Sequence, residues 1–198
     1  MPLIDLIRHG ETETPGLLLG RTDSALSETG WRQFERQTAH RTWTSIVSSP
    51  LRRSREAAER LARSRNLPLR IDCDWAELDF GHWDGRTVAE LRADSATAAA
   101  LDAFYRDPKA PGPPDGESWH MLCARIARAL DRVLEEAADG TVLVVTHGGA
   151  MRAAIAHACA FPLAQTWALR IDPATRITLR VGRESARIWG EIVEVVQP

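Results

Sequence analysis

Two segments of this 198-residue chain share one local pattern, a run of apolar residues that ends in His-Gly. The first run covers residues 3–7 and leads into Arg8-His9-Gly10, and the second covers residues 141–146 and leads into His147-Gly148-Gly149. Short aliphatic runs stopped by polar residues are typical of strands that are buried on both faces of a parallel sheet. Parallel strands end at the same edge of a sheet, where ligands bind. The pattern therefore predicts that His9 and His147 open into one crevice.

The rest of the chain alternates between the periodicities of strands and helices. The expected further elements are strands at 45–48 and near 69–71, helices after Ser27, after Pro50 and from Trp119 to about residue 137, and strands within 166–196. Strands that alternate with helices favour an α/β fold. We expect three layers (α/β/α) around a mainly parallel central sheet.

Composition narrows the classes of partner. Lys and Arg number 25 and Asp and Glu 27, so the net charge of −2 gives no overall attraction to nucleic acid or an anionic membrane. The longest apolar stretch, residues 141–161, is interrupted by His, Gly and Arg and falls short of the roughly 18 apolar residues of a membrane span. The first residues lack the cationic segment of a signal peptide. We therefore expect one cytoplasmic domain over residues 1–198 that acts on a small molecule, with neither nucleic acid nor a membrane as partner.

Two arginines accompany the two histidines. Arg8 directly precedes His9, and Arg53 falls in the first turn of the helix expected after Pro50, where the helix end is already partly positive. A helix N-terminus together with a guanidinium makes an anion site. This combination predicts a bound phosphoryl group beside a histidine that acts as a general base or forms a covalent phosphohistidine.

A metal site is the competing interpretation of the histidines. The six histidines form no HxH or HExxH pattern, and the three cysteines form no CxxC pair. Arg8 beside His9 would also repel a cation. We therefore expect no metal and no cofactor.

Four motifs in this order resemble those of the histidine phosphatase superfamily, whose fold is also called phosphoglycerate-mutase-like. They are Arg8-His9-Gly10, Ser49-Pro50-Leu51-Arg52-Arg53, Glu77 followed by Gly81-His82-Trp83-Asp84-Gly85, and Thr146-His147-Gly148. The resemblance implies a phosphoric monoester hydrolase in which His9 takes the phosphoryl group and Glu77 is the general acid. Asp79 and Asp84 are the alternatives to Glu77. The residues implied to bind the phosphate are Arg8, Arg53, His147 and Gly148.

Within the superfamily, residues 20–23, 26–33 and 113–118 most resemble the bacterial α-ribazole-5′-phosphate phosphatases of cobalamin biosynthesis. The alternatives are a broad sugar-phosphate or phosphoglycolate-type phosphatase and a phosphoglycerate mutase. Mutases of this family usually carry asparagine and threonine where this chain has Pro15 and Leu19, which favours hydrolysis over mutase transfer. A catalytically inactive relative that only binds a phosphorylated ligand is a further hypothesis.

The substrate beyond its phosphate needs a site of its own. The candidates for this site are Gly20, Arg21, His82 and the Pro- and Gly-rich loop of residues 107–118, which has the composition of a lid. The seven tryptophans leave open an exposed interface patch, and with it a homodimer.

Overall fold

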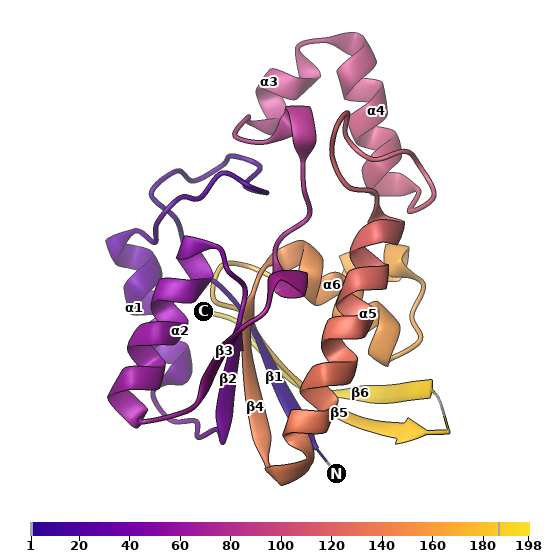
Figure 1. Cartoon of the computed structure of the whole chain (residues 1–198). Helices are drawn as coiled ribbons and strands as arrows, with labels where there is room; N and C mark the ends of the chain where they lie inside the picture. Colours follow the sequence, from indigo (N-terminus) through magenta and orange to yellow (C-terminus); the bar gives the residue numbers. More distant parts are fainter. Residues whose placement is uncertain (1, 186) are drawn as a thin grey trace.

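The computed structural model describes residues 2–185 and 187–198. In these residues six strands form one sheet, in the order β3-β2-β4-β1-β5-β6 (Figure 1). The strands are β1 (Leu3–Arg8), β2 (Ser45–Ser48), β3 (Leu69–Ile71), β4 (Thr141–Thr146), β5 (Arg176–Glu184) and β6 (Arg187–Val196). The first four pair in parallel, whereas β5 and β6 extend the sheet beyond β1 as antiparallel strands. The predicted mainly parallel sheet is confirmed.

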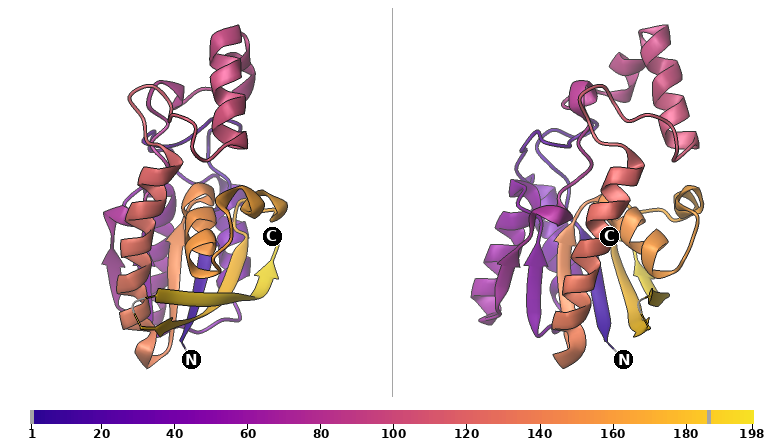
Figure 2. Two further views of the ribbon diagram at one scale, coloured as in Figure 1. Left: turned by 90° about the vertical axis from the view of Figure 1, so that its right-hand side faces the viewer. Right: turned by 45° about the vertical axis from the view of Figure 1, so that its right-hand side comes forward.

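Helices cover both faces of this sheet, as Figure 2 shows from two further sides. On one face lie α1 (Glu28–Thr38) and α2 (Arg52–Arg65), and on the other lie α5 (Trp119–Glu136) and α6 (Gly148–Ala158). α3 (Val88–Arg92) and α4 (Ser95–Arg106) project beyond the edge at which β1 ends (Figure 1). The short 3-10 helices are η1 (Cys73–Trp75), η2 (Gly81–Trp83), η3 (Ala137–Asp139) and η4 (Leu163–Ala168). The expected three-layer α/β/α architecture is therefore confirmed.

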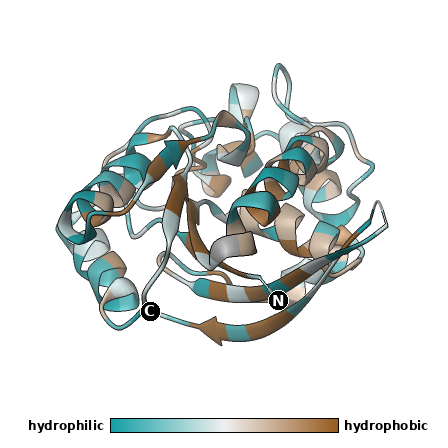
Figure 3. Cartoon of the chain, turned by 60° about the horizontal axis from the view of Figure 1, so that its bottom comes forward, coloured by the Kyte–Doolittle hydropathy of each residue, from teal (hydrophilic) through white to brown (hydrophobic). Residues whose placement is uncertain are grey.

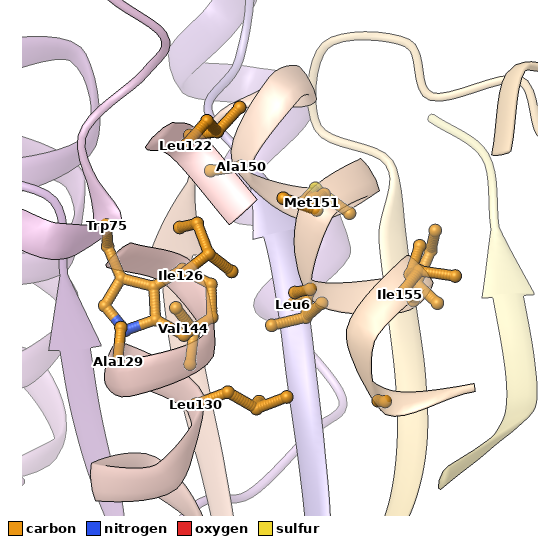
Figure 4. Close-up of a cluster of buried hydrophobic side chains, with 14 of the residues drawn as sticks. Leu6, Trp75, Leu122, Ile126, Ala129, Leu130, Val144, Ala150, Met151 and Ile155 are labelled. Carbon is orange, nitrogen blue, oxygen red and sulfur yellow. The ribbon is translucent and has the colours of Figure 1, made fainter. Parts of the chain in front are cut away.

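Alternating side chains of the strands fill two hydrophobic clusters. On β4, Val142 and Val144 belong to the cluster beneath α5 and α6, whereas Leu143 and Val145 belong to the cluster beneath α1 and α2. Figure 4 shows the first cluster, where Leu6 of β1 faces side chains of both helices. The hydropathy colours of Figure 3 agree, with hydrophobic strands between helices that are hydrophilic on their outer faces. Since each fully buried aliphatic side chain contributes about 1.5–3 kcal/mol, these two clusters hold the three layers together.

Local capping decides where the helices around the site begin. Ser27 Oγ accepts a hydrogen bond from Gly30 N (3.0 Å) at the start of α1, as its identity as an N-cap predicts. The start of α2 has no cap from its own N-cap side chain, and a carboxylate oxygen of Asp23 accepts from Arg52 N instead (2.6 Å). Asp23 thus supplies the negative charge that a helix start favours and ties the loop before α1 to α2.

One expectation about the C-terminal part is wrong. Residues 163–168 form the 3-10 helix η4, and the strands begin only at Arg176. The physical reason is a contact with α6, because Arg152 Nη1 donates to the carbonyl oxygens of Thr166 and of Leu169 (3.2 Å). These bonds hold the segment against the helix and keep it out of the sheet.

Candidate active site

His9 and His147 meet at the edge where β1 and β4 end. The register pairs Arg8 with Thr146, so the residue after each strand occupies the same level, and His9 N donates to the carbonyl oxygen of Thr146 (2.9 Å). The centroids of the two imidazole rings lie 5.1 Å apart. The two histidines meet as predicted, because their strands pair in parallel. The expectation that both open into one crevice is wrong for His147, which is fully buried among Ser49, Arg53 and His9 and does not line the cavity that His9 lines.

The hydrogen bond of the His9 ring selects its tautomer. Nδ1 lies 2.7 Å from the carbonyl oxygen of Gly10. A carbonyl oxygen only accepts, so Nδ1 carries the proton and the other ring nitrogen, Nε2, keeps its lone pair. Burial lowers the pKa of His9 well below its ordinary value, and the charges of Arg53 and Arg8 lower it further. His9 is therefore neutral at pH 7, with Nε2 free to act as a nucleophile.

His147 is fixed in the opposite tautomer. Arg53 Nε donates to its Nδ1 (3.3 Å), which must therefore be unprotonated, and its Nε2 lies 2.6 Å from Ser49 Oγ, which accepts the remaining proton. Burial lowers the pKa of His147 well below its ordinary value, with Arg53 as the next cause. Both nitrogens of the ring are thus bound, one by Ser49, which precedes α2, and the other by Arg53 in the first turn of α2.

Arg8 contributes a donor that nothing in the described part of the chain satisfies. Its Nη1 donates to the carbonyl oxygen of Ile171 (2.8 Å), but its Nε is buried without a hydrogen-bond partner among the described residues. Arg8 and Gly148 both line the same cavity, and Gly148 is the first residue of α6, whose N-cap residue supplies no side-chain cap. A helix N-terminus beside an unpaired guanidinium nitrogen is an anion-binding arrangement.

Arg53 lies differently from the expectation that it contacts an anion in the crevice. It is fully buried, and its guanidinium donates to the carbonyl oxygens of Leu19 (2.6 Å), Gly20 (3.3 Å) and Thr22 (3.0 Å). It does not line the cavity in this arrangement. What the structure assigns to Arg53 is the hydrogen bond to His147 and a positive charge close to both imidazoles.

Glu77 faces the same cavity as His9 and Arg8. One of its carboxylate oxygens accepts from Gly149 N (3.1 Å) in the first turn of α6, and the other accepts from Leu78 N (2.9 Å). The two alternative carboxylates, those of Asp79 and Asp84, bind other groups. Asp84 accepts from the backbone N of residues 20–22, and Asp79 pairs with Arg21 (3.1 Å) and accepts from Gly81 N (3.0 Å). Only Glu77 among these three carboxylates lines the cavity.

The cavity has a volume of about 340 Å³ and extends from Arg8, His9 and Gly148 to residues of other elements. Pro15 and Leu19, the two positions that depart from the mutase pattern, both line it. Its far wall comes from residues that the sequence analysis did not single out: Tyr105, Trp119, Arg152 and Trp167. For Arg152 a signal existed in the spacing, because it lies four residues after Gly148 and so on the same face of α6.

The three predicted substrate contacts lie outside this cavity. His82 Nε2 is 2.9 Å from a carboxylate oxygen of Asp115, with both side chains mostly exposed, and Gly20 N donates to Asp84 (2.7 Å). Arg21, in its ion pair with Asp79, is likewise not among the lining residues. The loop 107–118 is fastened to the segment of His82, whose N donates to the carbonyl oxygen of Pro114 (2.9 Å). In this structure the polar groups of these residues bind one another and hold their segments together outside the cavity.

Two further features of the described residues concern metal ions and membranes. No three His, Cys, Asp or Glu side chains there are grouped as ligands for a metal ion. No described helix has the length and apolar character that crossing a membrane requires.

The two lowered histidine pKa values predict a pH-dependent stability. The unfolded chain binds protons on both histidines below about pH 6.5, whereas the folded chain keeps them neutral, so stability must fall as pH falls. We expect the free energy of unfolding to drop by about 1.4 kcal/mol per pH unit for each of the two groups between about pH 6.5 and 5. Urea unfolding of wild type and His9→Ala measures this slope, which should be roughly halved in the variant. An equal slope in both proteins would contradict the prediction, and replacing the exposed His40 by alanine provides the control.

Fold and site together define an α/β protein in which an unprotonated histidine nitrogen, an arginine with an unpaired nitrogen and a carboxylate belong to residues that line one cavity at the sheet edge. Such a set of groups is suited to phosphoryl transfer. A profile of the Histidine phosphatase superfamily (branch 1) matches residues 4–190. The chain belongs to this superfamily.

Individual relatives point to more than one substrate. The chain is 34% identical over 148 residues to the Bifunctional protein Rv2228c of Mycobacterium tuberculosis, a match covering 72% of this chain but only 40% of that protein's length. It is 28% identical over 172 residues to the adenosylcobalamin/alpha-ribazole phosphatase of Salmonella typhimurium, with 84% of each covered. The solved structure of mycobacterial glucosyl-3-phosphoglycerate phosphatase Rv2419c with VO3 matches with a TM-score of 0.87, 27% identity and 98% of each chain covered.

Proposed function

We propose that this protein is a metal-independent phosphomonoesterase that works through a phosphohistidine at His9. The observation that carries the proposal is one juxtaposition. The unprotonated Nε2 of His9 and the unpartnered Nε of Arg8 belong to residues that line one cavity, at the N-terminus of α6. A nucleophile beside a donor that needs an anion is what attack on a phosphate monoester requires.

In the first step, His9 Nε2 attacks phosphorus as the bond from phosphorus to the leaving-group oxygen breaks. Arg8 and the backbone N–H of Gly148 bind the phosphoryl oxygens, and Glu77 gives its proton to the leaving oxygen, which departs as an alcohol. His147 and Arg53 complete the phosphate site from behind His9. Arg53 can reach a phosphate oxygen with its one unused N–H, on Nη1, or by exchanging one of its three carbonyl partners.

In the second step, a water molecule attacks the phosphohistidine. Glu77 is now a carboxylate and takes a proton from that water, so the new oxygen bonds to phosphorus while the bond to His9 Nε2 breaks. The products are inorganic phosphate and the enzyme with neutral His9 and protonated Glu77, ready for another cycle. No metal ion takes part in either step.

The substrate has two candidates. α-Ribazole 5′-phosphate is supported by the sequence pattern of residues 20–33 and 113–118 and by similarity to the Salmonella typhimurium phosphatase. An acidic phosphomonoester is supported by a different observation, the presence of Arg152 in the far wall of the cavity.

Release of inorganic phosphate in the presence of EDTA tests the proposal. The panel is α-ribazole 5′-phosphate, 3-phosphoglycerate, phosphoglycolate and several sugar phosphates, each with wild type and His9→Ala. We expect turnover by wild type alone, undiminished by EDTA, because the site uses protein groups only.

Each other outcome of the panel has a defined meaning. Conversion of 3-phosphoglycerate to an isomer, on addition of a bisphosphorylated primer, would identify a mutase. Equal inertness of wild type and His9→Ala on every substrate would favour a protein that only binds phosphorylated ligands. Loss of activity in EDTA that returns with metal would contradict the metal-independent mechanism.

A further inference from the structure

Buried arginines in this protein fall into two groups. Arg176 pairs with Glu194 (2.8 Å) and Arg125 pairs with Glu117 (2.7 Å), whereas Arg53 and Arg152 have no carboxylate partner among the described residues, and of these two only Arg152 lines the cavity. Arg152 is only 9% exposed, yet no carboxylate of the described residues lies within ion-pair distance of it. Burying an uncompensated guanidinium is unfavourable. An arginine retained in that state beside a cavity points to an anion that comes from outside the chain.

The contacts of Arg152 leave one edge of its guanidinium available. Both of its hydrogen bonds use Nη1, which donates to the carbonyl oxygens of Thr166 and Leu169. Its guanidinium carbon lies 4.1 Å from the ring centroid of Trp167, so one face is covered. Nε and Nη2 make no hydrogen bond to the described residues, and together they form the edge that binds a carboxylate with two parallel hydrogen bonds.

The charge of Arg152 is poorly compensated where it lies. Burial lowers its pKa to about 10, and repulsion from Arg8 adds to this effect. Aromatic residues surround it, with the Trp167 ring in edge contact with Tyr105 (5.4 Å between centroids) and Trp119 (5.8 Å). A single cation in an apolar wall favours a ligand group with a single negative charge.

The helix places this cation at a defined position relative to the phosphate site. Arg152 lies four residues after Gly148 on α6, so it belongs to the same helix face, about 5–6 Å further along. Helix side chains lean toward the helix N-terminus, and Gly148 and Gly149 have no side chains to block that direction. A ligand whose phosphate lies at the start of α6 can therefore extend along this face to Arg152.

We propose that Arg152 binds a carboxylate on the leaving group, and that the preferred substrates are phosphorylated hydroxy acids. The inference rests on the proposed function, because it assumes that the reacting phosphate lies at His9, Arg8 and Gly148. A spacing of about one helical turn fits a phosphate and a carboxylate separated by a short carbon chain.

A matched substrate pair tests the role of Arg152. 3-Phosphoglycerate and glycerol 3-phosphate have the same carbon skeleton and differ in a carboxylate at the end remote from the phosphate. We expect wild type to prefer 3-phosphoglycerate in kcat/KM by about 10-fold or more, as a charge-assisted pair of hydrogen bonds provides. Arg152→Gln should lower kcat/KM for 3-phosphoglycerate by about 10- to 100-fold, mainly through KM, and change that for glycerol 3-phosphate by less than about 3-fold. Arg63→Gln, on the exposed side of α2, is the matched control and should change neither.

The other outcomes separate this inference from the proposed function. Equal losses on both substrates in Arg152→Gln would overturn the inference, because Arg152 would then bind the reacting phosphate or only support η4. The inference would also be overturned if wild type showed no preference for 3-phosphoglycerate over glycerol 3-phosphate. This comparison does not depend on the folding of any variant. If the enzyme hydrolyses α-ribazole 5′-phosphate but neither 3-phosphoglycerate nor phosphoglycolate, the inference is overturned while the proposed phosphatase activity stands. Inertness toward every phosphomonoester would remove the proposed function itself.

Discussion

His9→Ala should abolish phosphatase activity, with kcat falling by a factor on the order of 10⁴ or more. The loss is this large because the proposed mechanism transfers the phosphoryl group to Nε2 of His9, and no other described histidine lines the cavity. His147 cannot replace it, since Arg53 and Ser49 hold both of its ring nitrogens. The measurement is the rate of inorganic phosphate release under saturating substrate.

Trapping of the intermediate identifies the atom that is phosphorylated. Brief mixing of wild type with ³²P-labelled substrate, followed by denaturation, should leave label on the protein that is stable in base and labile in acid, as expected for a phosphohistidine. His9→Ala should carry no label, and His40→Ala, changed at an exposed histidine beyond α1, should label like wild type. Label that persists in His9→Ala would assign the nucleophile to a different residue.

The parts of the fold and site that the sequence predicted are those that local pattern and strand pairing determine. The positions of His9 and His147 follow from two apolar runs of the same kind that pair in parallel, with Arg8 opposite Thr146. The strand over residues 45–48 and the helix from Trp119 were likewise predictable, because periodicity and flanking residues set their ends. The part of the cavity lined by Arg8, His9 and Gly148 is therefore set mainly by the ends of β1 and β4.

The far wall of the cavity could not be predicted, because segments distant in the sequence form it. Trp167 lines the cavity from η4, which is bound to Arg152, and Tyr105 comes from α4, which projects beyond the sheet. The contacts of Arg53 could not be predicted for the same reason. Its place in the first turn of α2 was predictable, but its carbonyl partners Leu19, Gly20 and Thr22 depend on the path of an irregular loop.

Glu77→Gln should lower kcat by about 10²- to 10⁴-fold for an alkyl phosphate, the range typical for the loss of a general acid. Glutamine has nearly the same shape and can still accept from Gly149 N, so the fold should be unaffected. With p-nitrophenyl phosphate, whose leaving group needs no proton, the first step should survive while the water-dependent second step fails. We therefore expect a stoichiometric burst of nitrophenol and a phosphohistidine that accumulates.

The matched control for this experiment is Glu35→Gln, at an exposed carboxylate on α1 that pairs with Arg60. It should leave both substrates and the burst unchanged. If Glu77→Gln slows alkyl and aryl substrates equally and accumulates no intermediate, Glu77 positions the site and does not transfer protons.

Gly149→Ala examines the same carboxylate through its neighbour. A Cβ added at Gly149 would come within 2.4 Å of an Oε of Glu77, whereas the next residue it meets, Leu122, is 3.6 Å away. Only the flexible carboxylate end must move, so the thermal midpoint should change little while activity falls toward that of Glu77→Gln. Because both changes then act on one group, the double variant should lose no more activity than Glu77→Gln alone. Additive losses would mean that Gly149 serves the reaction by another route, such as its backbone N–H.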